Sequence, residues 1–272
     1  MSLRTLARRA LPRDLPNQEG VGQSIPIAAP TLGMNTRDGV SSLDPREARS
    51  IKNMIAENGR LVIRKGKLEH QVIPAVSSVG TMFTHRGVSA DVLLAAAGGE
   101  IYDVTGTPDV LTAATYSLNV WSIAQLNDTA IAVNGTDTPW SFDGTTVDVT
   151  GLSGSGLTIA NLRTVRLVGT RLWFTEEGQA WVWYLAASAI TGVLTKFNLQ
   201  EQTKGGYCAG VYEFGPYTVF VMSTGEVLAY QGDPGTDFSF SKRYQAPAPV
   251  GYDHAVDVQG DLFLMTTSGA LP

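Results

Sequence analysis

The residues best suited to metal or nucleophilic chemistry are three histidines and one cysteine, and they are scattered along the chain. His70, His85 and His254 stand far from one another and from Cys208. Zinc sites draw on closely grouped ligands, and neither an HExxH nor a paired-cysteine motif occurs. We therefore interpret the histidines as surface or interface residues and Cys208 as a small buried apolar residue. A single cysteine provides no disulfide framework within the chain, so nothing argues for secretion.

Carboxylates offer a second chemistry, the acid–base hydrolysis of a glycosidic bond. Glu176 and Glu177 are adjacent in an expected hairpin turn, so their side chains should point apart. Residues 141–145, Ser-Phe-Asp-Gly-Thr, resemble the Asp-box turn of sialidases, but the glycine comes one residue early and no tryptophan follows. A glycosidase therefore stays the enzymatic alternative and is not our main interpretation.

Motifs for nucleotide binding and acyl transfer are incomplete. Six residues separate Gly59 from Gly66 instead of four, and Leu68 occupies the place of the magnesium-binding Ser/Thr, so a phosphate cradle cannot form. Residues 151–155 lack the last glycine of a nucleophile elbow. We predict a non-enzymatic protein that needs no cofactor and no metal.

Basic residues are concentrated near the N-terminus. Residues 1–70 hold twelve of the 20 Lys and Arg and seven of the 25 Asp and Glu, a net charge of +5, which leaves −10 for the rest. Basic side chains beside a strand can meet phosphates, or they can be a solvated strand edge that charge keeps from aggregating. The candidate interface or DNA-facing residues are Arg8, Arg9, Arg13, Arg37, Arg60, Arg64, Lys65 and Lys67.

The elements that would position these residues are strands. Residues 161–184 alternate apolar and polar residues, with turn residues between aromatic and β-branched runs, which indicates an antiparallel meander. Similar units occupy residues 92–102, 123–142 and 211–230. The aromatics that close the units are separated by 38, 43 and 47 residues: Tyr102, Trp140, Trp183 and Tyr230.

A repeat of this length holding about four strands is typical of a propeller blade. We therefore predict an all-β fold, a β-propeller-like array of four-stranded blades over residues 76–272, with a β-sandwich as the alternative. The five tryptophans are expected in the blade core, not on a base-stacking platform. A fifth copy opens at Val256 and the sequence ends at Pro272 where its last strand should begin, so we expect the last blade to be truncated.

Two further segments precede the repeats. Residues 1–30 are rich in proline and arginine and are expected to form a flexible or partner-ordered basic arm. Residues 31–75 are expected to form a loop, a short helix and a strand. Asp44 to Glu47 resembles a capping box, apolar residues from Ala48 to Ile55 share a helical face, and Asn58-Gly59 ends the helix before a strand at Arg60 to Lys65. No apolar run reaches the length of a membrane span.

Several of these segments also resemble a known family. Residues 32–38 carry G-x-N-T-R-D, residues 44–48 carry D-P-x-x-A, and residues 64–66 read R-K-G. Together with residues 95–103, 230–234 and 260–269, which look like blade turns, they resemble short-tailed bacteriophage tail proteins of the packaged-DNA stabilisation or tail nozzle group. The likeness covers Pro30 to Pro272, and such proteins are usually longer.

The resemblance implies a structural virion protein that is assembled in the host cytoplasm. It would form a homo-oligomer, a hexameric ring below the portal and adaptor, continue the DNA channel and help to retain the packaged genome. An acidic propeller would repel DNA phosphates and so allow DNA to pass. The alternatives from other classes are a propeller glycosidase or carbohydrate-binding tail protein, and a general protein-interaction propeller.

Overall fold

The computed structural model describes residues 30–37, 42–52, 54–57, 60–63, 70–74, 76, 78–112, 115–258 and 261–271. The chain divides into two compact units, Met1–Leu68 (unit 1) and Glu69–Pro272 (unit 2), which are considered separately. In the described part of the chain, no helix is long and apolar enough to cross a membrane.

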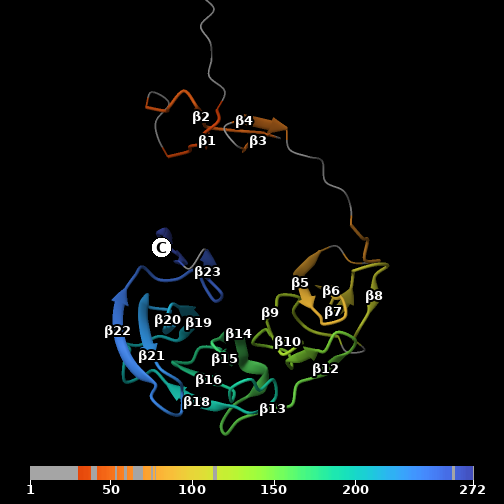
Figure 1. Ribbon diagram of the computed structural model, residues 1–272, viewed down its shortest axis with the longest axis vertical. Coiled ribbons are helices and arrows are strands. Elements are labelled where there is room, and N and C mark those ends of the chain that lie inside the picture. The colour runs from red at the N-terminus through yellow and green to blue at the C-terminus, as the bar shows by residue number, and fades with distance from the viewer. Residues whose placement is uncertain are drawn as a thin grey trace, which may run out of the picture. The chain divides into compact units, whose positions relative to one another are not determined.

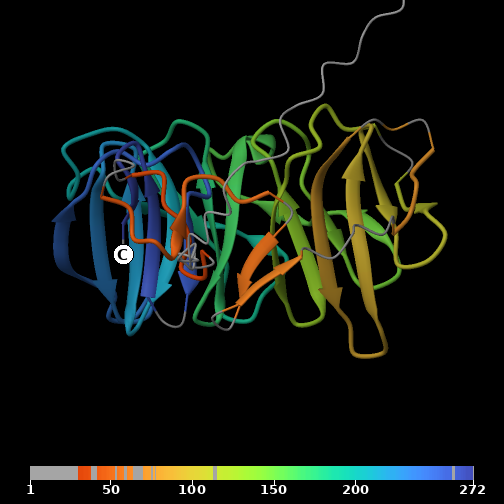
Figure 2. The ribbon, with the colours of Figure 1, turned by 90° about the horizontal axis from the view of Figure 1, so that it is seen from above.

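Unit 2 is a β-propeller whose five blade sheets follow one another around an arc (Figure 1). Each sheet is an antiparallel meander in which strands that are consecutive in the sequence are mostly neighbours. The first strand of each sheet lies toward the inside of the arc and the last lies toward the outside (Figure 1). The strands run through the thickness of the arc. The turns between them therefore gather at the two ends of each sheet, on opposite sides of the arc (Figure 2). The predicted fold class is therefore confirmed.

Blades 1 and 2 each have four strands in the order of the sequence. The strands of blade 1 are β5 (Val79–Arg86), β6 (Asp91–Ala97), β7 (Glu100–Asp103) and β8 (Asp109–Val110). Those of blade 2 are β9 (Ser122–Leu126), β10 (Thr129–Val133), β11 (Trp140–Phe142) and β12 (Val147–Val149).

Blade 3 carries an insertion between its third and fourth strands. Before the blade, β13 (Leu152–Ser153) pairs in parallel with β17 (Gly192–Val193) of that insertion, and the 3-10 turn η1 (Ile159–Asn161) leads into the first strand. The strands of blade 3 are β14 (Leu162–Val168), β15 (Arg171–Glu176), β16 (Trp181–Tyr184) and β18 (Thr195–Asn198).

Blade 4 has four strands, and blade 5 has three among the described residues. Those of blade 4 are β19 (Cys208–Phe214), β20 (Tyr217–Met222), β21 (Glu226–Gln231) and β22 (Ser239–Gln245). Those of blade 5 are β23 (Ala255–Val258), β24 (Asp261–Thr266) and β25 (Gly269–Leu271).

The aromatic residues that closed the sequence repeats are structurally equivalent. Each lies on the third strand of its blade, namely β7, β11, β16 and β21, and each is buried. Apolar clusters fill the interfaces between successive blades, as when Trp140 of blade 2 packs with Leu94 of blade 1, and Trp173 of blade 3 with Phe220 of blade 4. Trp121 is also buried and Trp181 is partly buried, in agreement with core positions for the tryptophans.

Unit 1 contains two small sheets and no helix among its described residues. β1 (Gly33–Met34) pairs in parallel with β2 (Glu47–Ala48), and β3 (Met54–Glu57) forms an antiparallel pair with β4 (Arg60–Ile63). The predicted helix is therefore wrong, whereas the strand that begins at Arg60 is present.

The reason for this error lies in local side-chain chemistry. The Asp44 carboxylate accepts the backbone N–H of Arg46, at 2.8 Å, and so closes a turn two residues on instead of capping a helix. Glu57 pairs with Arg60, so the strands flank Asn58-Gly59, which lies outside the described residues. Asn-Gly is the dipeptide most favoured in two-residue hairpin connections, so the same two residues in a sequence can indicate either a hairpin turn or the end of a helix.

Candidate functional site

The blades of the propeller leave open clefts where their turns meet at one end. In an antiparallel meander, the turn between the first and second strands and the turn between the third and fourth lie at the same end of the sheet. The cleft end of unit 2 is therefore defined by the β5–β6, β9–β10, β14–β15 and β19–β20 turns, together with the β11–β12 and β21–β22 turns. At two junctions, that of blades 1 and 2 and that of blades 3 and 4, two first-strand turns meet the last turn of the following blade.

Cleft 1, between blades 1 and 2, has a volume of about 200 Å³. Its lining comes from the β5–β6 turn (residues 87–90), Asp128 of the β9–β10 turn, and Asp143 to Thr145 of the β11–β12 turn. Val88 at its rim is 89% exposed. The cleft thus joins three turns that are distant in sequence and carries two carboxylates.

His85 lies beneath cleft 1 and is fully buried. Its Nε2 is 3.0 Å from the backbone carbonyl oxygen of Asp128, and its ring meets Phe142 edge-on at 5.0 Å between centroids. A carbonyl oxygen only accepts hydrogen bonds, so Nε2 carries the proton in the neutral ring, and Nδ1 is left as an acceptor. Nδ1 is buried and has no hydrogen-bond partner among the described residues.

Asp128 occupies a backbone conformation that few residues adopt. Its φ is +61° and that of Asn127 is +48°, the left-handed geometry of the two central residues of a type I′ hairpin turn. Asn and Asp tolerate this region better than other side chains do, which explains their presence here. Asp128 Oδ1 accepts the backbone N–H of Val88 at 3.2 Å, so this turn is joined to the turn of blade 1.

Asp143 organises the third turn of cleft 1. Its Oδ1 accepts the backbone N–H groups of Thr145 and Thr146, at 2.9 and 2.8 Å, and the Thr145 hydroxyl. These bonds, that from Thr146 first, lower the pKa of Asp143 to about 2. The carboxylate is therefore ionised at neutral pH, and among the described residues Oδ2 has only a long contact, 3.5 Å, with the Thr146 hydroxyl.

Replacing Asp143 with alanine is expected to lower the free energy of unfolding by about 1 kcal/mol, because two turn N–H groups lose their acceptor. Asp143→Asn keeps an acceptor oxygen and should lose only a few tenths of that. The folded-state pKa lies below the unfolded one, so the stabilisation is present above about pH 4 and is lost as the pH falls toward 2. Urea unfolding of both variants at pH 7 checks the order, and equal losses would contradict it.

The next junction along the arc, between blades 2 and 3, is closed by the blade 3 insertion. Ser188 donates its backbone N–H to the carbonyl oxygen of Thr170 at 2.7 Å, and its own carbonyl oxygen accepts the Asn127 side-chain amide at 2.7 Å. The insertion therefore links the two first-strand turns at the position where an open cleft lies in its neighbours.

Cleft 3, between blades 3 and 4, has a volume of about 280 Å³. Glu213 accepts the backbone N–H of Gly169 at 2.9 Å, which is the counterpart of the Asp128 contact with Val88. The two clefts differ in that only the lining of cleft 3 includes a basic residue. In cleft 3 the Arg171 guanidinium lies in the lining and forms an ion pair with Asp233 at 2.6 Å.

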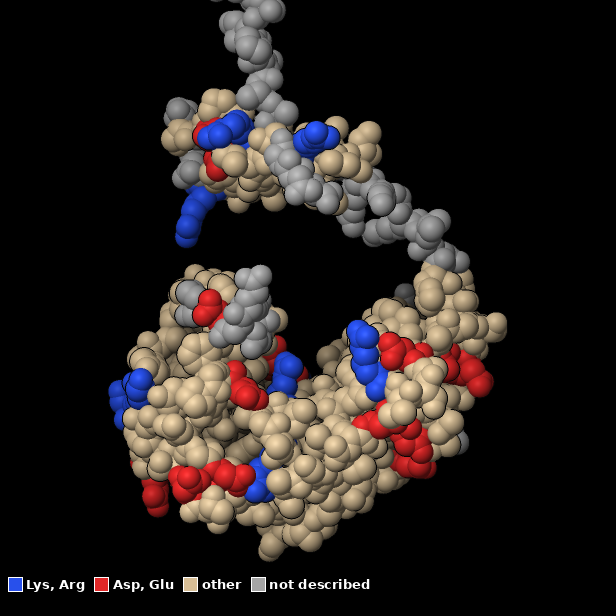
Figure 3. All heavy atoms as spheres, in the orientation of Figure 1, with Lys and Arg blue, Asp and Glu red and all other residues tan. Residues whose placement is uncertain are grey.

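Acidic side chains predominate on the face seen along the propeller axis. Red spheres gather over blades 1 and 2 and again at the junction of blades 3 and 4 (Figure 3). Asp128 and Asp143 line cleft 1, and Glu213 and Asp233 line cleft 3. The arrangement favours positively charged ligands at these junctions.

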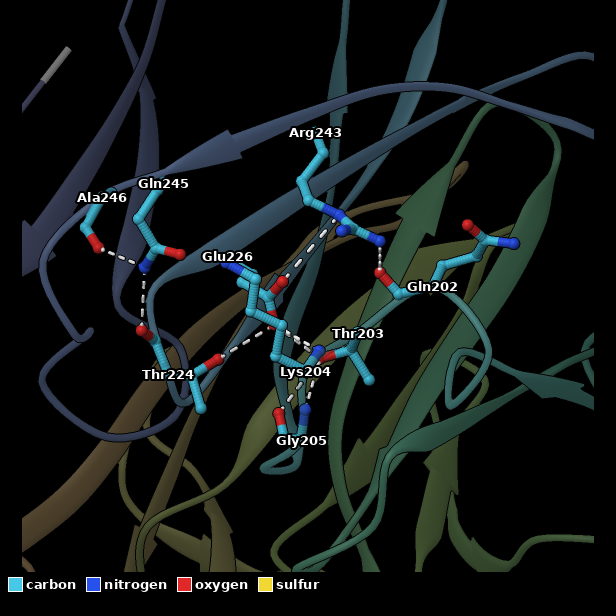
Figure 4. A network of polar contacts seen from close by, with 9 residues as sticks. All are labelled: Gln202, Thr203, Lys204, Gly205, Thr224, Glu226, Arg243, Gln245 and Ala246. Atoms are coloured by element: carbon cyan, nitrogen blue, oxygen red, sulfur yellow. Dashed lines mark hydrogen bonds and ion pairs between the residues drawn. The ribbon is translucent and has the colours of Figure 1, made fainter.

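Three further glutamates form structural contacts, and two of them, Glu176 and Glu226, are buried. Glu176 accepts the indole N–H groups of Trp181 and Trp183, at 2.6 and 2.8 Å, while Glu177 pairs with Arg163 at 3.4 Å. Glu226 is at the centre of a polar network that joins blade 4 to the linker before it (Figure 4). Glu176 and Glu177 therefore take separate partners, as their adjacent positions predicted.

The residues chosen from sequence for metal or nucleophilic chemistry each contact a different backbone carbonyl oxygen. Cys208 is buried, as predicted, and burial raises the pKa of its thiol to about 12. His70 is exposed, but His85 and His254 are buried, so a surface position is wrong for those two. Among the described residues, no group of three or more His, Cys, Asp or Glu is placed to hold a metal ion.

Two of the basic candidate residues fall in the described part of the chain, and both are exposed. Arg37 follows β1, and Arg60 begins β4. Their interface or DNA-facing role stays a prediction. The remaining candidates lie outside the described residues: Arg8, Arg9, Arg13, Arg64, Lys65 and Lys67.

Sequence reasoning placed Asp143 in a turn that resembles an Asp box and did not predict the cleft. His85 meets Asp128 across 43 positions in the sequence, so no local pattern brings them together. Asn127-Asp128 and Asp143-Gly144 are the signals that could have been used, because both mark tight turns with a carboxylate at the tip.

Comparison with known protein families and with curated proteins gives no match. Among solved structures, BamB from Moraxella catarrhalis is similar with a TM-score of 0.43 and 12% identity, covering 78% of this chain and 62% of that chain. BBS1N, solved in complex with ARL6DN and soaked with lead, has a TM-score of 0.48 and 13% identity, covering 78% and 70%. The computationally designed Ika4 protein has a TM-score of 0.40 and 13% identity, covering 61% and 100%.

This chain therefore spans about three fifths of the length of the BamB chain, at 62%. Likenesses of this size do not extend to activity or partners. The function has to be inferred from the surfaces of this chain itself.

Proposed function

We propose that this protein is a structural, non-enzymatic propeller that acts by binding other proteins. The observation that carries the proposal is the surface of unit 1, where none of the described residues is buried. Six of its large apolar side chains are exposed by 42% to 74%: Leu32, Met34, Met54, Ile55, Val62 and Ile63. Water-exposed apolar groups at this density are a mark of an interaction surface.

The exposure of apolar side chains is clearest in the β3–β4 hairpin. Met54 lies opposite Ile63 and Ile55 lies opposite Val62, and all four side chains are exposed. Successive residues of a strand point to opposite faces, so both faces of the hairpin are apolar. An isolated two-stranded hairpin is marginally stable in water, so covering by a partner would stabilise it.

The propeller supplies a rigid body for such an interaction. Four apolar clusters join successive blades, and they contain fully buried side chains such as Trp173 and Phe174. Close-packed interiors of this kind have few alternative arrangements. A stiff scaffold with exposed turns at both ends suits a role in assembly.

The narrower proposal is a virion component of a short-tailed bacteriophage, which forms a homo-oligomeric ring with portal and adaptor proteins around the DNA channel. Two of the segments that resemble the tail nozzle group support it, because they form one local structure. Gly33 and Met34 pair with Glu47 and Ala48, and the Asn35 side-chain amide donates to the Glu47 carboxylate at 2.8 Å. Residues 33–35 and 47–48, which belong to the segments that resemble the nozzle group, are thus in direct contact.

Size-exclusion chromatography with light scattering, combined with co-assembly on purified portal–adaptor particles, tests both levels. We expect a defined oligomer, or a complex that forms only when the particles are present. A protein that stays monomeric and does not bind the particles would contradict the narrower proposal. A monomer that also hydrolyses polysaccharide would overturn the non-enzymatic proposal.

A further inference from the structure

The floor of cleft 1 presents an acceptor to the space above it. A Cβ on Gly144 would lie 3.4 Å from Cε1 of His85 and 3.9 Å from Nδ1, and a Cβ on Gly87 would lie 3.6 Å from Cε1. Both glycines line the cleft. At Gly87 a Cβ would also lie 2.4 Å from the Ala90 carbonyl oxygen, so the open position is the one at Gly144. The Cε1–Nδ1 edge of the buried ring faces that position, and the Nδ1 lone pair gives the floor a negative potential.

The walls of cleft 1 add two carboxylates that can each accept further hydrogen bonds. Asp128 uses Oδ1 for the Val88 N–H, and Asp143 uses Oδ1 for its turn, so each retains an Oδ2 with little or no engagement among the described residues. Oδ1 of Asp128 also lies 3.9 Å from His85 Nε2. Every polar side-chain group that the two carboxylates and the imidazole offer to the cleft is thus an acceptor.

A ligand for such a site must bring donors and positive charge. A lysine ammonium has three donors and no acceptor, whereas a phosphate or a carboxylate would be repelled by the carboxylates of Asp128 and Asp143, and the Thr145 hydroxyl already donates to Asp143. Val88, Ala90 and Val92 also line the cleft, and they offer apolar contact to the methylene stem of a lysine. The volume of about 200 Å³ suits one side chain of this size.

We propose that cleft 1 binds a lysine side chain of a partner protein, with the ammonium group held between Asp128 and Asp143 above His85. The proposal rests on the proposed function in requiring a protein partner. Cleft 3 is the natural comparison within the same molecule. Its carboxylates are similarly placed, but the Arg171 guanidinium in its lining already pairs with Asp233, and it would repel a second cation.

The test is an NMR titration of the full chain with acetyl-Gly-Lys-Gly-amide. The backbone N–H signals of Val88, Gly144 and Thr145 report on cleft 1. We expect saturable shifts of these signals, and no shift with a norleucine peptide that keeps the methylenes and lacks the ammonium.

Asp128→Asn should weaken binding of the lysine peptide about fivefold, which corresponds to one solvent-accessible ion pair. Asparagine tolerates the left-handed backbone at this position and can still accept the Val88 N–H, so the turn is retained. Asp109→Asn, which removes an exposed carboxylate outside the cleft, is the matched control and should bind like the parent. If Asp128→Asn fails to fold, Asp143→Asn provides the same test, because its amide oxygen can still accept the turn N–H groups.

Three results would overturn the proposal: equal shifts with the norleucine peptide, unchanged affinity in the folded asparagine variants, or equal shifts of the Gly169 and Glu213 signals in cleft 3. None of these measurements depends on co-assembly with particles. Failure of the cleft assignment can therefore be told apart from failure of the proposed structural role.

Discussion

Glu226→Ala is expected to lower the free energy of unfolding by about 3 kcal/mol at pH 7. Glu226 is 1% exposed at the start of β21, where its Oε2 accepts the Thr203 hydroxyl at 2.7 Å and the Lys204 backbone N–H at 2.8 Å. Alanine would leave the Lys204 N–H without this acceptor and the Thr203 hydroxyl with only the Gly205 carbonyl oxygen, at 3.0 Å. Hydrogen bonds to a charged group contribute about 1.5–3 kcal/mol each, and the lower value for these two part-buried donors gives the expected loss.

Arg243 adds a charge to the same network. Its Nε lies 3.8 Å from Oε1 of Glu226, and it also donates to the carbonyl oxygen of Gln202 (Figure 4). The Gln202–Gly205 linker joins blade 3 to blade 4, and Arg243 belongs to β22. The carboxylate therefore ties the linker to the third and fourth strands of blade 4, and its removal should also loosen the blade 3–4 junction.

The charge on Glu226 makes this stabilisation depend on pH. Burial opposes the charged form, but the hydrogen bonds from Lys204 and Thr203 and the positive charge of Arg243 outweigh it and lower the pKa below the usual 4.5. A folded-state pKa below the unfolded one means that the contribution is present above about pH 4.5 and is lost as the pH falls through the folded value. The difference between the parent and Glu226→Gln should therefore be largest near neutral pH and shrink below 4.5.

Chemical unfolding at several pH values measures both effects. Glu226→Gln keeps the shape and one acceptor, so it should lose less than Glu226→Ala. Glu201→Ala removes an exposed glutamate from the same stretch of chain and should change the free energy of unfolding by no more than about 0.5 kcal/mol. A Glu226→Ala variant as stable as this control would show that the network contributes little.

The sequence was sufficient to predict the blades because their signal is local and repeated. Alternating strands and closing aromatics recur every 38 to 47 residues, and Tyr102, Trp140, Trp183 and Tyr230 do occupy equivalent third strands. Burial between blades requires a large apolar residue at the same place in each unit. This requirement produces a periodic pattern of aromatic residues that is visible in the sequence alone.

Residues 44–57 show where such reading fails. Asp44 and Glu47 fit a capping box, and the apolar residues that follow fit a helical face. In the structure Glu47 and Ala48 instead pair with β1, and Met54 to Glu57 pair with β4. Both segments pair with another strand, β2 with one more than ten residues earlier and β3 with the strand that follows it directly, and helix propensity is too weak to oppose this pairing. The clefts were missed for a similar reason, since they exist only where separate blades meet.

The second large effect is expected from the apolar surface of unit 1. Replacing Val62 and Ile63 together with asparagine should weaken co-assembly by about 30-fold or more, the equivalent of about 2 kcal/mol for an interface hot spot. Ile63 is 74% exposed and Val62 is 42% exposed, so their loss should leave the unfolding of the propeller unchanged. The reason is that neither side chain belongs to a buried cluster of unit 2.

The matched control is Val149→Asn on β12, because Val149 is also 74% exposed but belongs to blade 2. Co-assembly can be measured as the fraction of chain that sediments with portal–adaptor particles, and folding by the thermal transition in circular dichroism. Unit 1 variants that assemble like the Val149 control would mean that exposed apolar side chains near the N-terminus play no part in binding. Equal loss in both variants would mean that surface apolarity in general, and not this hairpin, drives association, because Ile63 and Val149 are equally exposed and lie in different units.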